Sequence, residues 1–151
     1  MRDGALQGDR DLQRLILVVD DQRDHLQMIE QILADEASCY QIVPVSTTSE
    51  AVEFLQRKGG HEQAMRPDIV LMNMRLLDGQ AQSILSTIKT DPSLRQIPTI
   101  ILSSDASTDD ILMSYQQRCN SFVLKPQDLT TLSEILQVIK SFWLDLVTLP
   151  L

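Results

Sequence analysis

Polar side chains follow short apolar runs at four points of the sequence, and these are the residues with which the chain could carry out chemistry. Asp20-Asp21 follows LILVV, Asn73 follows IVLM, Ser103 ends TIILS and Lys125 follows SFVL. Short apolar runs of this kind are typical of buried strands, and strand ends beside loops carry the functional groups of many α/β proteins. Asn73 is the unexpected member, because an acid would be the more useful reagent at such a position.

The elements that must position these residues are five apolar runs that alternate with five helical patterns. This alternation predicts a parallel sheet with helices on both faces, in the flavodoxin-like strand order 2-1-3-4-5. The carboxyl ends of such strands share one rim, so the four polar positions should converge there. Pro44 predicts an edge position or a bulge for the second strand. The strands are expected at 15–19, 41–45, 68–72, 99–103 and 121–124.

The order and types of these residues resemble the receiver domain of two-component response regulators. The matching segments are LILVVDD, PDIVLMN, IPTIILSS and SFVLKP, which extend over nearly the whole chain from Leu15 onward. The resemblance implies a stand-alone signalling protein, not an enzyme, whose partner is a sensor histidine kinase or a downstream signalling protein. The tail, KPQDL and TIKTDPSLRQIP are also similar to single-domain receivers that partner cyanobacterial phytochromes and are commonly dimeric.

The resemblance also implies roles for the converging residues. Asp20 and Asp21 would form an acidic pocket that holds Mg²⁺ with the backbone carbonyl of Arg75, since Mg²⁺ prefers oxygen ligands. Ser103 would donate its hydroxyl to a phosphoryl oxygen. Lys125 would pair with the phosphoryl group, or with the carboxylates when that group is absent.

Further positions relate to the conformational switch of the family. Phe122 matches an aromatic residue that changes rotamer, and the Lys125–Pro126 peptide is expected to be cis. Three residues depart from the usual pattern: Leu77 replaces a Pro, Ala81 replaces a Gly found in many members, and Ser104 stands where Ala is frequent.

Asn73 falls at the phosphoacceptor position, where the family carries Asp. A carboxylate can attack phosphorus, whereas a neutral amide is a far poorer nucleophile, and losing one of three acids weakens the attraction for Mg²⁺. The expectation is therefore a pseudo-receiver that acts by protein contact. Two alternatives stay open: an ordinary receiver frozen by an engineered Asp-to-Asn change, and a small Mg²⁺-dependent α/β phosphatase.

Composition excludes several other classes. The net charge of −8, without a local basic cluster, argues against nucleic acid as a partner. No apolar run approaches the roughly 20 residues of a membrane span, and the charged N-terminus lacks the apolar stretch of a signal peptide. A cytoplasmic location is expected. His25 and His61 have no matching ligand partners and are expected at the surface.

The chain divides into a flexible leader at 1–14, a receiver domain at 15–140 and an apolar extension of the last helix at 141–151. We expect no room for an output domain after the last helix. A contiguous exposed apolar patch marks an interface, so the extension is a candidate homodimer surface. The alternative is that it folds back on its own domain. Its candidate interface residues are Phe142, Trp143, Leu146, Val147 and Leu149.

Overall fold

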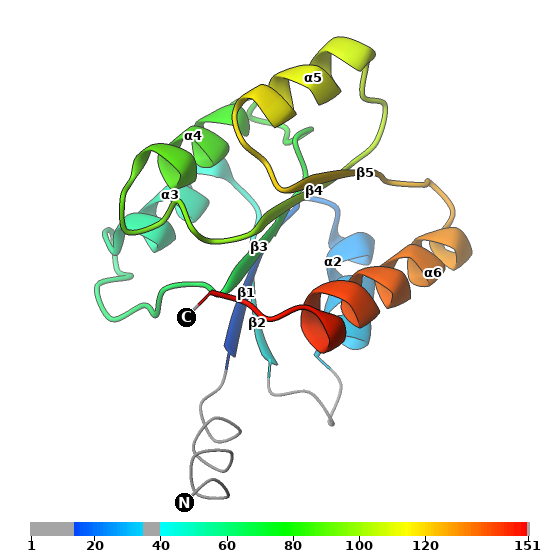
Figure 1. The fold of residues 1–151 in the computed structure, drawn as a ribbon, viewed down its shortest axis with the longest axis horizontal. Coiled ribbons are helices and arrows are strands. Elements are labelled where there is room, and N and C mark those ends of the chain that lie inside the picture. Colours follow the sequence, from blue (N-terminus) through cyan, green and yellow to red (C-terminus); the bar gives the residue numbers. More distant parts are fainter. Residues whose placement is uncertain (1–13, 35–39, 151) are drawn as a thin grey trace, which may run out of the picture.

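A computed structural model describes residues 14–34 and 40–150, and it shows a parallel sheet between two layers of helices (Figure 1). Except for Arg14, which begins β1, the predicted leader lies outside the described residues. The strands are β1 (Arg14–Val19), β2 (Tyr40–Val45), β3 (Ile69–Met72), β4 (Thr99–Ser103) and β5 (Ser121–Leu124). The helices are α2 (Arg23–Leu33), α3 (Thr48–Gln56), α4 (Gln82–Thr90), α5 (Thr108–Gln116), α6 (Leu129–Ile139) and the π-helical η1 (Lys140–Leu146).

The strand order is β2-β1-β3-β4-β5, and every pair is parallel, which confirms the predicted fold. Val19 is level with Val45 on one side and with Met72 on the other, so these three strands end together. Pro44 lies on β2, which is an edge strand as expected, because proline cannot donate to a second neighbour.

The strands bury both faces, since successive side chains point to opposite sides of a sheet. In β1, Leu15, Leu17 and Val19 enter the core beneath α3 and α4, whereas Ile16 and Val18 enter the core beneath α2 and α6. Figure 1 shows these helices on opposite sides of the sheet, with α5 on the side of α3 and α4. The uninterrupted apolar runs in the sequence reflect this double burial.

The C-terminal segment partly folds back on the domain. Leu149 is buried, and Trp143 and Val147 pack against the core beneath α2 and α6. Leu149 is therefore a core contact, whereas Trp143 and Val147 are only partly buried and their role in an interface stays a prediction. Phe142 and Leu146 remain 46% and 72% exposed, and their role in an interface stays a prediction.

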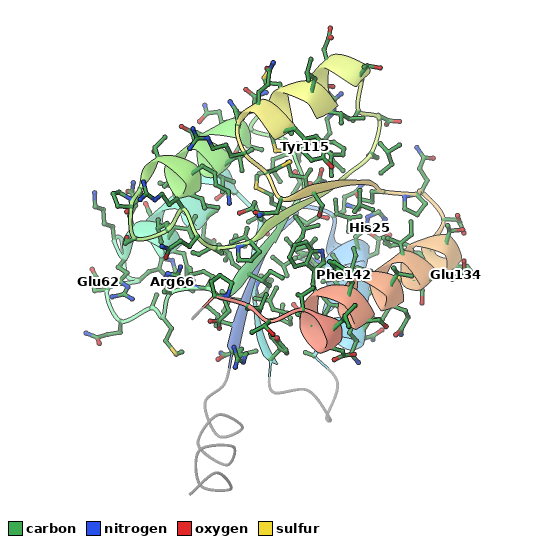
Figure 2. The ribbon with its side chains drawn as sticks, viewed as in Figure 1. His25, Glu62, Arg66, Tyr115, Glu134 and Phe142 are labelled. Atoms are coloured by element: carbon green, nitrogen blue, oxygen red, sulfur yellow. The ribbon has the colours of Figure 1, made fainter. Side chains whose placement is uncertain are left out.

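Two further expectations are wrong. His25 is buried on the first turn of α2 (Figure 2), four residues before the buried Ile29, so it belongs to the inward stripe of that helix. The Lys125–Pro126 peptide is trans, because the described residues contain no cis peptide bond. Within 14–34 and 40–150, no helix combines the length and the apolar character that crossing a membrane requires.

Candidate functional site

The ends of β1, β3, β4 and β5 place four buried polar residues together. Backbone bonds fix their positions: the N–H of Asn73 donates to the Val19 carbonyl at 2.8 Å, and that of Lys125 donates to the Ser103 carbonyl at 2.9 Å. Asp20, Asn73, Ser103 and Lys125 are each no more than 4% exposed. Groups buried this deeply need partners, because an unpaired buried polar group is costly.

Lys125 forms a buried ion pair with Asp20. Its Nζ lies 2.6 Å from Asp20 Oδ2 and also donates to Gln22 Oε1 at 2.9 Å. The backbone N–H of Gln22 donates to Asp20 Oδ1 at 3.0 Å. Gln22 was missed by sequence reasoning, although its place directly after the acid pair was a usable signal. The ammonium group of Lys125 thus neutralises the buried carboxylate of Asp20.

Asn73 uses both ends of its amide. Its Oδ1 accepts from Ser103 Oγ at 3.0 Å and from the backbone N–H of Arg75 at 2.9 Å. Its Nδ2 donates to Asp20 Oδ1 at 3.3 Å. This orientation follows from the network, because only an oxygen can accept from a backbone N–H and only the amide nitrogen can donate. An ionised aspartate has no donor and could not bond to Asp20 in this way.

Asp21 lies apart from this buried network. It is partly exposed, and its Oδ2 accepts from the backbone N–H of Leu77 at 2.7 Å. The bond holds the β3–α4 connection against the end of β1. Leu77 itself is 95% exposed, so the replacement of Pro by Leu places no new side chain in the core.

Arg75 joins the β3–α4 connection to the β4–α5 connection. Its guanidinium forms an ion pair with Asp110 at 2.9 Å and donates to the Asp105 carbonyl at 2.7 Å. Hydrogen bonds from the backbone and hydroxyl of Ser107, with a smaller contribution from Arg75, hold the pKa of Asp110 below its usual value. Asp110 therefore stays ionised and available to this contact.

Phe122 lies beside the buried network, not within it. It packs partly buried against the core beneath α3 and α4, and its backbone N–H donates to the hydroxyl of Tyr115 at 3.1 Å. A cavity of about 300 Å³ lies between Phe122, Ser103 and Arg75. Pro126 follows Lys125 directly at the end of β5.

Three carboxylate oxygens of the expected Mg²⁺ ligands accept hydrogen bonds from protein groups. Both oxygens of Asp20 accept hydrogen bonds, and Oδ2 of Asp21 accepts from Leu77. Among the described residues, no three His, Cys, Asp or Glu side chains come together in a way that could hold a metal ion. A cation at this edge of the sheet would compete with the Lys125 ammonium group for the carboxylate of Asp20.

Known proteins are similar to this chain in fold and in sequence. The model of the response regulator receiver domain matches residues 16–137. Response regulator Rcp1 of Synechocystis sp. is 30% identical over 137 residues, which are 91% of this chain and 93% of the relative. The crystal structure of the Mn(2+)-bound form of Rcp1 has a TM-score of 0.87 at 30% identity, over 91% of this chain and 99% of that one.

A second similar structure is that of the phosphorylated cyanobacterial phytochrome response regulator RcpA, with a TM-score of 0.88 and 32% identity. It covers 93% of this chain and 100% of its own. The family match extends over most of the chain and agrees with the strand order and with the polar residues gathered at the strand ends. The chain therefore belongs to the response regulator receiver domain family of two-component signalling.

Proposed function

We propose that this protein is a pseudo-receiver, which transmits its signal by protein contact without accepting a phosphoryl group at Asn73. The observation that carries the proposal is the amide of Asn73, which bonds to Asp20, Ser103 and the Arg75 backbone at once. The position of Asn73 at the end of β3 corresponds to the phosphoacceptor of the family. An amide there lacks the anionic oxygen that attacks phosphorus.

Intact-mass spectrometry after incubation with acetyl phosphate and Mg²⁺ tests this proposal. We expect no phosphoryl adduct on the natural chain and an adduct on Asn73→Asp. Asn120→Asp is the matched control, because it makes the same chemical change at the start of β5, where the Asn120 side chain accepts from Thr99 and Lys89. An adduct at Asn73 on the natural chain would refute the proposal. An Asn73→Asp variant that stays unlabelled would refute the idea that Asn73 alone disables the site.

The same residues support weakened Mg²⁺ binding. Lys125 already neutralises Asp20, and Asn73 contributes no negative charge. A cation that entered would have to displace an ammonium group and would meet two carboxylates instead of three. Calorimetric titration with Mg²⁺ should therefore show a lower affinity for the natural chain than for Asn73→Asp. Equal affinities would contradict this reasoning.

The alternatives differ in their support. The relatives give no support to a phosphatase, and the neutral Asn73 lacks the acidic nucleophile that it would need. Asn73→Asp would recover an ordinary receiver if Asn73 is an engineered change, and the labelling experiment reveals that capacity directly. The partner that we propose is a sensor histidine kinase or a downstream signalling protein, as the similarity to a phytochrome response regulator suggests.

We also propose a homodimer that forms through an apolar ridge of α6 and η1. Val138, Phe142 and Leu146 are spaced four residues apart and are 68%, 46% and 72% exposed. Exposed apolar side chains aligned in this way are typical of an interface. Truncating the tail would also remove the buried Leu149, so a point substitution is the cleaner test.

Analytical ultracentrifugation of Phe142→Glu measures whether the ridge holds two copies together. We expect a dimer for the natural chain and a monomer for the variant, because a charge cannot be buried there without a partner. Leu112→Glu, at a 54% exposed position on α5, is the control and should remain dimeric. A monomeric natural chain would refute the homodimer, and a dimeric Phe142→Glu variant would exclude this surface.

A further inference from the structure

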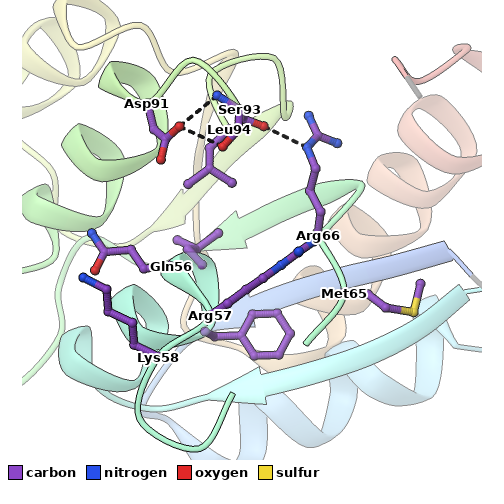
Figure 3. A pocket seen from close by; sticks show the side chains of 10 residues that line it. Gln56, Arg57, Lys58, Met65, Arg66, Asp91, Ser93 and Leu94 are labelled. Carbon is purple, nitrogen blue, oxygen red and sulfur yellow. Dashed lines mark hydrogen bonds between the residues drawn. The ribbon is translucent and has the colours of Figure 1, made fainter. Parts of the chain in front are cut away.

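A second pocket lies away from the network around Asn73 and has the opposite charge. It is formed by the C-terminal end of α3, the segment before β3 and the turn after α4, and it has a volume of about 430 Å³ (Figure 3). Arg57, Lys58 and Arg66 line it on a chain whose net charge is −8. Folding brings Arg66 to the same pocket as Arg57 and Lys58, which are adjacent in the sequence.

The three cations are available to a ligand. Within residues 14–34 and 40–150, none of them has a carboxylate within 4.0 Å, and the structure gives no hydrogen bond to the side chains of Arg57 or Lys58. Arg66 donates its Nε to the Ser93 carbonyl at 3.0 Å, which fixes the side chain and leaves its terminal nitrogens free. Figure 3 shows Arg57 extending in the direction of Arg66. The fixed guanidinium group of Arg66 suits a phosphate.

The location explains part of this charge, but not all of it. Arg57 is the C-terminal cap of α3 in a left-handed conformation, with φ of 58°, and cations are favoured near helix C-termini. That effect accounts for Arg57 and Lys58. It does not account for Arg66, which belongs to the segment before β3. Its bond to Ser93 aims a third positive charge into the same pocket.

The rest of the lining suits an apolar ring and hydroxyl groups. Leu55 and Leu94 are buried at the pocket wall, and Met65 is 54% exposed at its edge. On the side of α4, Asp91 Oδ1 accepts from the N–H and hydroxyl of Ser93, both at 2.8 Å. Among the described residues Asp91 Oδ2 has no hydrogen bond, so it can accept from ligand hydroxyl groups.

We propose that this pocket binds a mononucleotide. The phosphate would contact the guanidinium groups of Arg57 and Arg66, the base would lie against Met65, and a sugar hydroxyl would donate to Asp91. A volume of about 430 Å³ falls within the range of small-molecule sites, which is roughly 300–1,000 Å³. The pocket lies at the opposite end of the sheet from Asn73, so this site does not depend on the pseudo-receiver proposal.

Nuclear magnetic resonance titration of the isotope-labelled full chain tests the site. The probes are AMP, GMP and their 3′,5′-cyclic forms, with adenosine, guanosine and inorganic phosphate as comparisons. We expect at least one nucleotide to shift the amide signals of residues 57–60 and 93–94. The corresponding nucleoside and inorganic phosphate should bind at least about tenfold more weakly than this nucleotide. The nucleoside lacks the phosphate contacts, and inorganic phosphate lacks the contacts of the base and sugar.

Substitutions complete the test. Arg57→Gln should weaken nucleotide binding about tenfold or more, the effect of losing one charge-assisted hydrogen bond. Arg118→Gln, which removes an exposed arginine from the α5–β5 connection, should leave the affinity unchanged. The proposal is overturned if no nucleotide shifts these signals, if inorganic phosphate binds as tightly as the nucleotide, or if both variants lose affinity equally.

Discussion

Replacing Asn73 by Asp changes a hydrogen bond into a repulsion, and this substitution tests the central contact of the site. In the natural chain, Asn73 Nδ2 donates to Asp20 Oδ1 at 3.3 Å. An ionised Asp at the same place puts two negative oxygens at about that separation. The donor is lost as well, and a buried acceptor that loses a partner costs about 1 kcal/mol or more.

The magnitude can be bounded from this geometry. Two unit charges 3.3 Å apart repel by about 5 kcal/mol at an effective dielectric constant of about 20. The positive charge of Lys125 offsets part of this repulsion. Protonation of the new carboxyl limits the cost at pH 7 to about 4 kcal/mol, because each pH unit above the ordinary Asp pKa of about 3.9 is worth about 1.4 kcal/mol. We therefore expect Asn73→Asp to lower the free energy of unfolding by about 1–4 kcal/mol.

Urea denaturation without divalent cations measures this loss, with the fluorescence of Trp143 as the signal. The loss should shrink at mildly acidic pH, where the new carboxyl is protonated. Saturating Mg²⁺ should restore much of the stability of the variant, since a ligand at about 100 times its Kd stabilises by about 2.7 kcal/mol. The natural chain should respond less. An Asn73→Asp variant that is as stable as the natural chain without Mg²⁺ would refute the reasoning.

Three other predictions use the same denaturation assay. Burial is the main cause that lowers the pKa of His25 below 6.5, and the charge of Lys125 adds to it, despite the nearby acids. The unfolded chain therefore binds more protons than the folded chain, and stability should fall as the pH drops below 6.5. His25→Gln should flatten this dependence, His61→Gln should not, and an unchanged slope in both would contradict the assignment. Lys125→Met should lower the free energy of unfolding by about 3–5 kcal/mol, because it leaves the Asp20 carboxylate unpaired. Adding Asp20→Asn to this variant should recover much of the lost stability. A loss below about 1 kcal/mol for Lys125→Met would show that the pair is not stabilising. Leu149→Ala should cost about 2 kcal/mol, near the low end for buried leucines, whereas a negligible change would show that the tail does not pack.

The sheet and the gathering of polar residues at one rim could be predicted because they follow from local patterns. Doubly buried strands appear as continuous apolar runs, and parallel strands place their carboxyl ends together. Whatever follows LILVV, IVLM, TIIL and SFVL must therefore meet. The pairing of Lys125 with an acid was expected from the resemblance. The choice of Asp20 over Asp21 and the contact with Gln22 could not be predicted, because they depend on side-chain conformations that no spacing encodes.

Some misses left a signal in the sequence and others did not. His25, Ile29 and Leu33 are spaced by four, which places the histidine on the buried stripe of α2, but the apolar residues alone were used to define that stripe. Arg57 and Arg66 are separated by a turn through two glycines, and only the packing of that turn brings them to one pocket. Charge counted along the chain cannot detect such a cluster.

The network around Asn73 also accounts for the buried charge and the lone pairs of Asp20. In a buried site, the charge of Asp20 needs a counter-charge, and its lone pairs need donors. Lys125 supplies the first, and Gln22 and Asn73 supply the second. The Asn73 amide therefore does more than remove a nucleophile. It donates a hydrogen bond to Asp20, whereas a carboxylate at the same position would repel Asp20 and would need a counter-charge. Under the pseudo-receiver proposal, a site whose buried charge is already paired would present one surface to a partner without phosphorylation.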